Sequence, residues 1–172
     1  MDDKANEKLA QLRAEIQQDS LVKGIDDLQV GDVIYYDMDR ADGINPMAYP
    51  SRLKYVVVAG DRSDDKEICA VLINSANDHS TDKDWIAEQY PILQKDYPSF
   101  LKHDSWIDCT SPHVLKVRKL KAKKAEKIDH LHSRDLSNVM TRLNENGFIQ
   151  PRILKTFGID KFGSSGISSD KN

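Results

Sequence analysis

The chain has 172 residues, of which 39% are hydrophobic and 31% are charged, and its formal net charge at pH 7 is −3. This composition is typical of a globular protein with one main core, and it excludes collagen, a disulfide-dense miniprotein and a multi-span membrane protein. The charge is uneven: residues 61–96 hold nine acids and four bases (net −5), whereas residues 97–127 hold eight bases and three acids (net +5). Nucleic acid binding therefore stays open, because phosphate responds to local basic density.

No apolar run approaches the roughly 18 residues that a membrane-spanning helix needs, and the N-terminus lacks the apolar segment of a secretory signal. We therefore expect a cytoplasmic protein with no membrane segment. The two cysteines, Cys69 and Cys109, lie 40 residues apart without a zinc-binding spacing. Such cysteines are expected to be reduced and buried.

The first predicted element is a helix over about residues 4–22. Leu9, Leu12 and Ile16 follow the i, i+3, i+7 spacing of a helix face, and Gly24 is expected to end it. The apolar stripe is thin. The helix is expected either to pack on the domain or a partner, or to remain an uncovered surface helix.

The central part of the chain is rich in β-branched residues. A strand is predicted over residues 30–39, followed by a loop over 41–50 and a hairpin whose strands cover 55–59 and 68–73. Residues 56–58 are all valines and show no alternation. We therefore expect this strand to be buried on both faces, as in a small barrel.

Polar residues 75–99 predict a loop with one helical turn near 84–89. Two further strands are predicted over 104–108 and 113–117. Five strands in about 90 residues suggest a small, strongly bent antiparallel sheet or barrel. The residues expected in its core are Val33, Tyr35, Val57, Val71, Leu72 and Ile107.

The last predicted element is a helix over residues 134–144. Ser133 is its predicted N-cap, and Asn146 and Gly147 stop it. The residues expected to face the core are Leu136, Val139, Met140 and Leu143. After the helix, the Gly- and Ser-rich end predicts about ten mobile residues.

The histidines give little sign of a metal site. His130 and His132 form an H-x-H pair without clustered cysteines or carboxylates, so polar residues introducing a helix are the stronger interpretation. His79 and His113 stand alone in predicted loops and are expected to be exposed. We predict no metal and no cofactor, and the common catalytic motifs GxSxG, GxGxxG, HExxH and the P-loop are missing from the sequence.

The order of the segments is more informative. Residues 31–36 (GDVIYY) are followed by a long loop, then Ser51-Arg52-Leu53 before a Val-rich strand, and then a strand that ends at Ser75. Later come residues 102–109 (KHDSWIDC) and 131–136 (LHSRDL). This succession resembles the PemK and MazF toxin family over about residues 29–146, although the family's proline after the arginine is missing.

The resemblance implies a mainly β protein with flanking helices (α+β), built as a small SH3-like antiparallel barrel and generally homodimeric. It also implies a metal-independent endoribonuclease that cuts single-stranded RNA and is blocked by a cognate antitoxin. The domains would be an N-terminal helical extension (1–27), the barrel with its C-terminal helix (28–147) and a partly mobile tail (148–172).

The resemblance also implies site residues, which are assigned by matching positions in this sequence to the family's pattern. Arg52 and Ser75 would flank the scissile phosphate, whereas Lys102 and Asp104 stand where the family has an Arg and an Asp. His103 is an additional candidate. Asp104 or His103 could act as the base towards the ribose 2′-OH, and a guanidinium can grip two phosphate oxygens. Lys102 supplies charge but lacks that planar fork.

Each residue also has a structural alternative. Arg52 could pair with an acid of the 61–67 loop, Asp104 could cap a turn, and Ser75 could close its strand. Tyr35 and Trp106 are favoured as core residues over base-stacking platforms.

The run 116–127 holds seven bases and one acid. It is either a solvated face or a rim that tracks RNA. The residues predicted to bind RNA on that rim are Lys116, Arg118, Lys119 and Lys121. Two functions stay open: a toxin endoribonuclease, and a binding module of the same fold that contacts RNA without cleavage or docks a protein partner.

Overall fold

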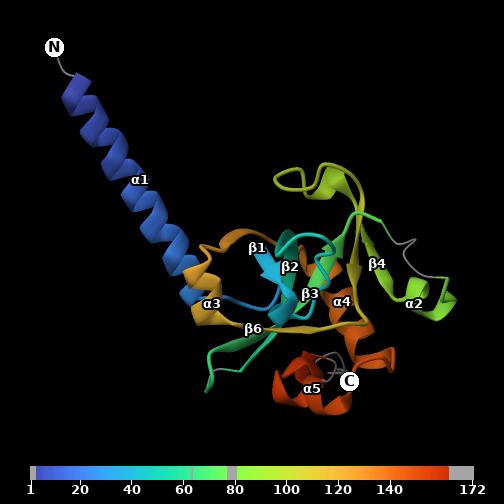
Figure 1. Cartoon of the computed structure of the whole chain (residues 1–172). Coiled ribbons are helices and arrows are strands. Elements are labelled where there is room, and N and C mark those ends of the chain that lie inside the picture. Colours follow the sequence, from blue (N-terminus) through green and yellow to red (C-terminus); the bar gives the residue numbers. More distant parts are fainter. Residues whose placement is uncertain (1–2, 63, 77–80, 163–172) are drawn as a thin grey trace, which may run out of the picture.

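The computed structural model describes residues 3–62, 64–76 and 81–162 of the chain. It shows an α+β protein in which a seven-stranded antiparallel sheet is flanked by helices, with a long N-terminal helix that projects away from the sheet (Figure 1). The strands are β1 (Asp32–Asp39), β2 (Ser51–Arg62), β3 (Glu67–Asn74), β4 (Gln89–Ile92), β5 (Ser105–Asp108), β6 (His113–Lys116) and β7 (Glu126–His130). The predicted α+β class is confirmed.

The strand order is β4-β5-β3-β2-β1-β7, and β6 also pairs with β3. The sheet forks along β3, because residues 67–70 pair with β6 and residues 73 and 74 pair with β5. Within the described residues this path stays open between β4 and β7, so the strand pairing does not form a closed barrel.

Five strands were expected, and the structure adds β4 and β7. β4 lies in the stretch predicted to be a loop and contains Pro91. A proline is tolerated there because β4 is an edge strand. β7 begins at the end of the basic run 116–127. Its sequence, EKIDH, has one apolar residue, so it shows almost no alternation of apolar and polar residues.

The sheet separates two apolar cores. Val57 belongs to the larger core, whereas Val56 and Val58 belong to the smaller one. Successive side chains of a strand point to opposite faces, so the expected burial of β2 on both sides is confirmed. Of the expected core residues, the fully buried ones are Val33, Val57, Val71 and Ile107, and the half-buried ones are Tyr35 and Leu72.

Helix α1 spans Asp3–Asp26 and confirms the predicted helix, but it continues past Gly24. Leu9 and Leu12 are each 54% exposed, while the Ile16 side chain lies outside the described part of the chain. Near the C-terminal end of the helix, Ile25 is buried in the smaller core. The described part of the apolar stripe is therefore uncovered, and the helix is anchored at its last turn.

The remaining helices are α2 (Lys83–Ala87), α3 (Val117–Ala122), α4 (Ser133–Glu145) and α5 (Pro151–Thr156). Helix α2 confirms the predicted helical turn, and α4 buries Val139, Met140 and Leu143 as expected. Its N-cap is His132 and not Ser133, and no side chain caps it. The reason is that the backbone of Ser133 is already helical.

The segment after α4 was predicted to be a partly mobile tail, but part of it packs into the core. Ile149, Leu154, Phe157 and Ile159 are buried in the larger core. Gly60 of β2 makes room for them: a Cβ on this residue would lie 2.4 Å from the carbonyl oxygen of Phe157. The final ten residues, expected to be mobile, lie outside the described ranges.

Cys69 and Cys109 are free and buried, as predicted. His113 was expected to be exposed, but it is buried in β6, where its Nδ1 lies 2.8 Å from the carbonyl oxygen of Asp42. The loop carrying Asp42 folds over it, which the local sequence does not indicate. His79 lies outside the described residues.

No helix in the described ranges is long and apolar enough to cross a membrane. Over the same residues, no group of three or more His, Cys, Asp or Glu side chains could hold a metal ion.

Candidate functional site

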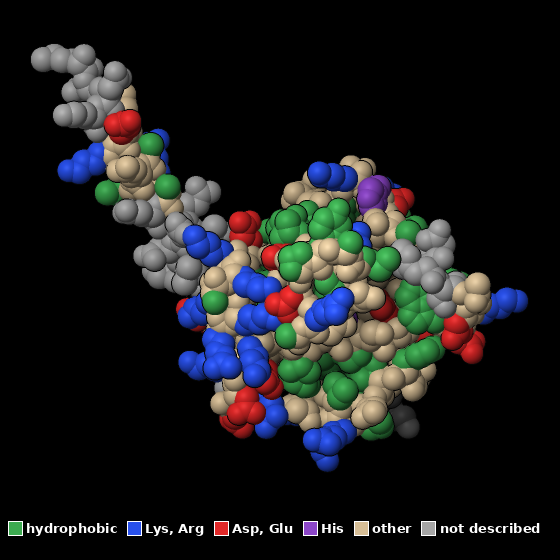
Figure 2. Space-filling model, in the orientation of Figure 1, with side chains coloured by type: hydrophobic (Ala, Val, Ile, Leu, Met, Phe, Trp, Pro, Cys, Tyr) green, Lys and Arg blue, Asp and Glu red, His purple; other side chains and the backbone are tan. Residues whose placement is uncertain are grey.

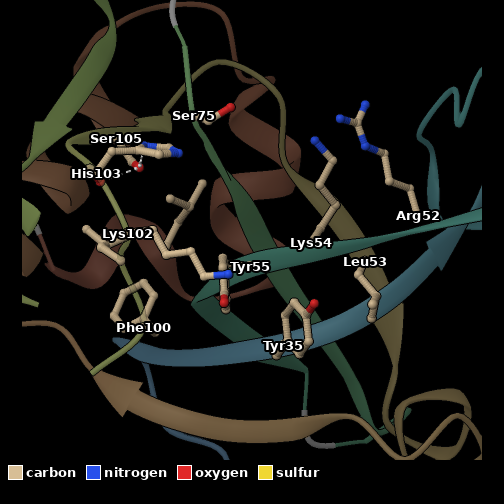
Figure 3. A pocket seen from close by; sticks show the side chains of 12 residues that line it. Tyr35, Arg52, Leu53, Lys54, Tyr55, Ser75, Phe100, Lys102, His103 and Ser105 are labelled. Carbon is tan, nitrogen blue, oxygen red and sulfur yellow. Dashed lines mark hydrogen bonds between the residues drawn. The ribbon is translucent and has the colours of Figure 1, made fainter. Parts of the chain in front are cut away.

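A cleft of about 280 Å³ lies over the start of β2 (Figure 3). Of the five residues predicted to be catalytic, four line it: Arg52, Ser75, Lys102 and His103. The other lining residues are Tyr35, Leu53, Lys54, Tyr55, Ile73, Phe100, Leu101 and Ser105.

Strand pairing explains why these distant segments meet. β2 lies between β1 and β3, so Tyr55 has Tyr35 on one side and Ile73 on the other. The start of an antiparallel strand lies beside the end of its partner, which brings residue 52 near residue 75. The segment before β5 joins them because β5 pairs with Ile73 and Asn74.

The charged side chains that line the cleft are all basic. Arg52, Lys54 and Lys102 line it together with His103, and none of the lining side chains is acidic. Among the described residues these three cations form no ion pair, so the expected alternative partner of Arg52 in the 61–67 loop is not found; that loop's ion pair joins Arg62 to Asp65. Clustered cations without acidic neighbours can attract an anion.

Lys54 is a member of the cleft that sequence reasoning missed. It is half-buried, and its burial, together with the charge of Arg52, lowers the pKa of its ammonium below the ordinary value of 10.5. The signal that could have found it is strand alternation, because residues 52 and 54 lie on the same side of an extended chain. Figure 3 shows both side chains extending in the same direction, across the cleft from His103.

The ring of His103 extends into the cleft between Ser75 and Lys102 (Figure 3). Its Nδ1 lies 3.0 Å from the carbonyl oxygen of Asp104. A carbonyl oxygen only accepts hydrogen bonds, so in the neutral ring Nδ1 carries the hydrogen and Nε2 keeps its lone pair. This tautomer makes Nε2 available to accept a proton.

Asp104 is the predicted site residue that does not line the cleft. Its Oδ1 accepts a hydrogen bond of 2.8 Å from the backbone N–H of Gln94. The carboxylate thus holds a turn, as the structural alternative expected in kind, but the turn begins ten residues earlier in the chain and is not the one directly before β5. This contact does not test the catalytic role predicted for Asp104 from the sequence, whereas His103 is a potential base that lines the cleft.

Aromatic side chains form one wall of the cleft. Tyr35 stacks on Tyr55 with ring centroids 4.7 Å apart, and Tyr55 contacts Phe100 at 5.2 Å. Tyr35 was expected to be a core residue, but its half-buried ring lines the cleft because the first residues of β2 extend beyond the core. Trp106 is half-buried in β5 and does not line the cleft.

The four residues predicted to bind RNA from the basic run are separate from this cleft. Lys119 bonds Asp39 at 2.7 Å and Asp42 at 2.8 Å, and Lys121 pairs with Asp26. These two lysines therefore already have acidic partners, which the linear sequence could not show.

Lys116 and Arg118 are exposed and form no ion pair among the described residues. They line a different surface cleft, of about 510 Å³, beside α3. Figure 2 shows Lys and Arg side chains gathered around the position of α3. An RNA contact by Lys116 and Arg118 stays a prediction.

Neither a protein-family model nor a curated protein matches this chain in sequence.

Proposed function

We propose that this protein is a metal-independent endoribonuclease of the PemK and MazF toxin type, which cuts single-stranded RNA. The observation that supports the proposal most strongly is the meeting of Arg52, Ser75, Lys102 and His103 in one cleft without acidic lining residues. In this proposal the forked sheet is a variant of the small SH3-like barrel of that family. The protein acts as a cytoplasmic homodimer, and a cognate antitoxin blocks the cleft.

The proposed reaction transfers the phosphate from the 5′-oxygen to the ribose 2′-oxygen. His103 Nε2 accepts the proton of the 2′-OH, whose oxygen attacks phosphorus and forms a 2′,3′-cyclic phosphate while the bond to the 5′-oxygen breaks. Arg52 binds the phosphate oxygens through its planar fork, and the Ser75 hydroxyl donates one further hydrogen bond. Lys102 adds positive charge.

The aromatic wall favours single-stranded RNA as the substrate. Bases stack on aromatic side chains with free energies of about 1–3 kcal/mol per base, and unstacked bases occur in single strands. Tyr35 lines the same cleft as Arg52, the residue that would hold the phosphate. A nucleobase next to the scissile bond would therefore stack on this wall.

RNA binding without cleavage is the second candidate. It is favoured by the position of Asp104, whose carboxylate bonds the backbone of Gln94 and does not line the cleft. If catalysis required this carboxylate, the cleft would hold RNA without cutting it.

The test is incubation of a long single-stranded RNA with the full-length protein in EDTA, beside Arg52→Ala, His103→Ala and Asp104→Ala. The control is Arg152→Ala, which removes an exposed arginine of α5 outside the cleft. We expect discrete cuts by the wild type, the control and Asp104→Ala, and their loss in folded Arg52→Ala and His103→Ala.

Two outcomes contradict the nuclease. Tight RNA binding without cuts over many sequences supports the binding module, and absence of both binding and cuts refutes a nucleic acid role for this cleft.

A further inference from the structure

Cleavage needs an acid as well as a base, because the departing 5′-oxygen must gain a proton. Arg52 cannot supply it, since an arginine does not give up its proton in proteins. We propose that Lys54 is a catalytic residue of the cleft, which donates a proton to the 5′-oxygen leaving group of the RNA. This inference rests on the proposed function, and Lys54 is not one of the residues that the family resemblance implied.

The position of Lys54 fits this role. It lines the same cleft as Arg52, Ser75 and His103. Figure 3 shows Lys54 and the His103 ring on opposite sides of Ser75. An in-line displacement needs its base and its acid on opposite sides of the phosphorus atom, and in this proposal His103 and Lys54 take those two sides.

Nothing in the described fold uses the charge of Lys54. The lysines of the α3 region differ: Lys119 bonds Asp39 and Asp42, and Lys123 bonds Asp39. Lys54 forms no hydrogen bond and no ion pair with any described residue, although it is half-buried. Burying an unpaired charge costs free energy, so this lysine is better explained by an anionic ligand than by stability.

The surroundings of Lys54 also suit proton donation. The charged and titratable side chains facing this cleft are Arg52, Lys102, His103, Tyr35 and Tyr55, and no carboxylate is among them. Burial and the Arg52 charge lower the pKa of Lys54, which makes its ammonium a stronger acid than an exposed lysine. An acid whose pKa lies closer to the working pH transfers its proton more effectively.

The proposed step balances as follows. His103 Nε2 takes the proton of the 2′-OH, and the bond between the 2′-oxygen and phosphorus forms. The bond between phosphorus and the 5′-oxygen breaks, and that oxygen takes a proton from the Lys54 ammonium. Lys54 is left as a neutral amine and His103 as an imidazolium, and exchange of one proton with water restores both.

The test compares the full-length wild type with Lys54→Arg, which keeps the positive charge but cannot donate its proton. The matched control is Lys83→Arg on an exposed residue of α2. Each protein is given two RNAs with one cleavable bond, in EDTA. The first RNA is normal, and in the second a sulfur atom replaces the bridging 5′-oxygen, because a thiolate departs without a proton.

We expect Lys54→Arg to cleave the normal RNA about 10²- to 10⁴-fold more slowly than the wild type. It should cleave the sulfur-containing RNA within a few-fold of the wild-type rate, and bind a 2′-deoxy analogue with unchanged affinity. In the wild type, kcat/KM should fall at high pH as Lys54 loses its proton, and this fall should vanish in Lys54→Arg.

Equal slowing on both RNAs, or wild-type rates on both, overturns the role of Lys54 while leaving the proposed nuclease intact. A wild type that cleaves neither RNA refutes the nuclease itself, and the inference with it. A folding defect is recognised by the melting temperature, and Lys54→Met then serves as the second variant. Removal of an unpaired, half-buried charge should leave that temperature unchanged or raise it.

Discussion

Replacing Lys119 by alanine distinguishes a structural lysine from one that binds RNA. In the structure the Lys119 ammonium bonds the carboxylates of Asp39 and Asp42. The Asp42 side chain is only 4% exposed, so it depends on protein partners more than on water. Burial alone would lower the pKa of Lys119, but the bonds to Asp39 and Asp42 outweigh it and raise that pKa.

The expected loss in the free energy of unfolding depends on which hydrogen bonds Asp39 and Asp42 keep after Lys119 is removed. Removing one partner of a buried ion pair typically costs 3–5 kcal/mol, because a charge is left uncompensated. Here Asp42 Oδ2 still accepts bonds from the Tyr36 hydroxyl and from the backbone N–H of Asp39, and Asp39 still bonds Lys123. We therefore expect a loss of about 2–3 kcal/mol in the free energy of unfolding.

For a chain of this size such a loss lowers the melting temperature by about 4–12 °C. Circular dichroism during heating and urea titration would measure it. Lys116→Ala is the matched control, because Lys116 is exposed and unpaired in the described structure, and its change should stay within about 0.5 kcal/mol.

RNA affinity is measured in parallel below the melting temperature, at several salt concentrations. A phosphate contact at Lys119 would reduce the slope of log affinity against log salt by about 0.7–0.9. An unchanged melting temperature combined with such a reduced slope would refute the structural role and restore Lys119 to the RNA-binding rim.

Two further predictions concern the C-terminal segment and acid stability. Ile159→Ala should lower the free energy of unfolding in urea by about 2–5 kcal/mol, because Ile159 is fully buried. Phe162→Ala is the control, because Phe162 is 48% exposed and should tolerate the change. Equal small effects of both substitutions would mean that this segment does not support the core. The hydrogen bonds from Lys119 and then Lys123 hold the pKa of Asp39 far below its usual range. The ionised Asp39 carboxylate therefore stabilises the folded state fully above about pH 4–5, and this contribution is lost as the pH falls through the folded-state pKa. Melting curves between pH 2 and 7 should show a weaker acid dependence in Lys119→Ala, and identical curves would contradict this assignment.

Much of the fold could be predicted because its elements carry local signals. The valines of β2 and the apolar stripe of α4 identify a strand and a helix without reference to the rest of the chain. β4 and β7 carry no such signal. They are short and polar or contain proline, and pairing with β5 and β1 is what makes them strands.

Part of the candidate site could likewise be predicted from the sequence, and part could not. The order of segments around Arg52, Ser75, Lys102 and His103 was visible in the sequence, and the structure brings these four to one cleft. Lys54 was missed because a lysine in a strand is ordinarily a solvent-facing residue.

The sequence by itself determined the residue types: a strand register, a helix face, and a set of basic side chains able to bind phosphate. Only the tertiary structure decided which basic side chains are available. Lys119 meets the carboxylates of Asp39 and Asp42 about 80 positions away, whereas Arg52 and Lys54 meet none among the described residues. The reason is physical: charge is a property of a residue, but its neutralisation depends on distance and burial, and folding sets both.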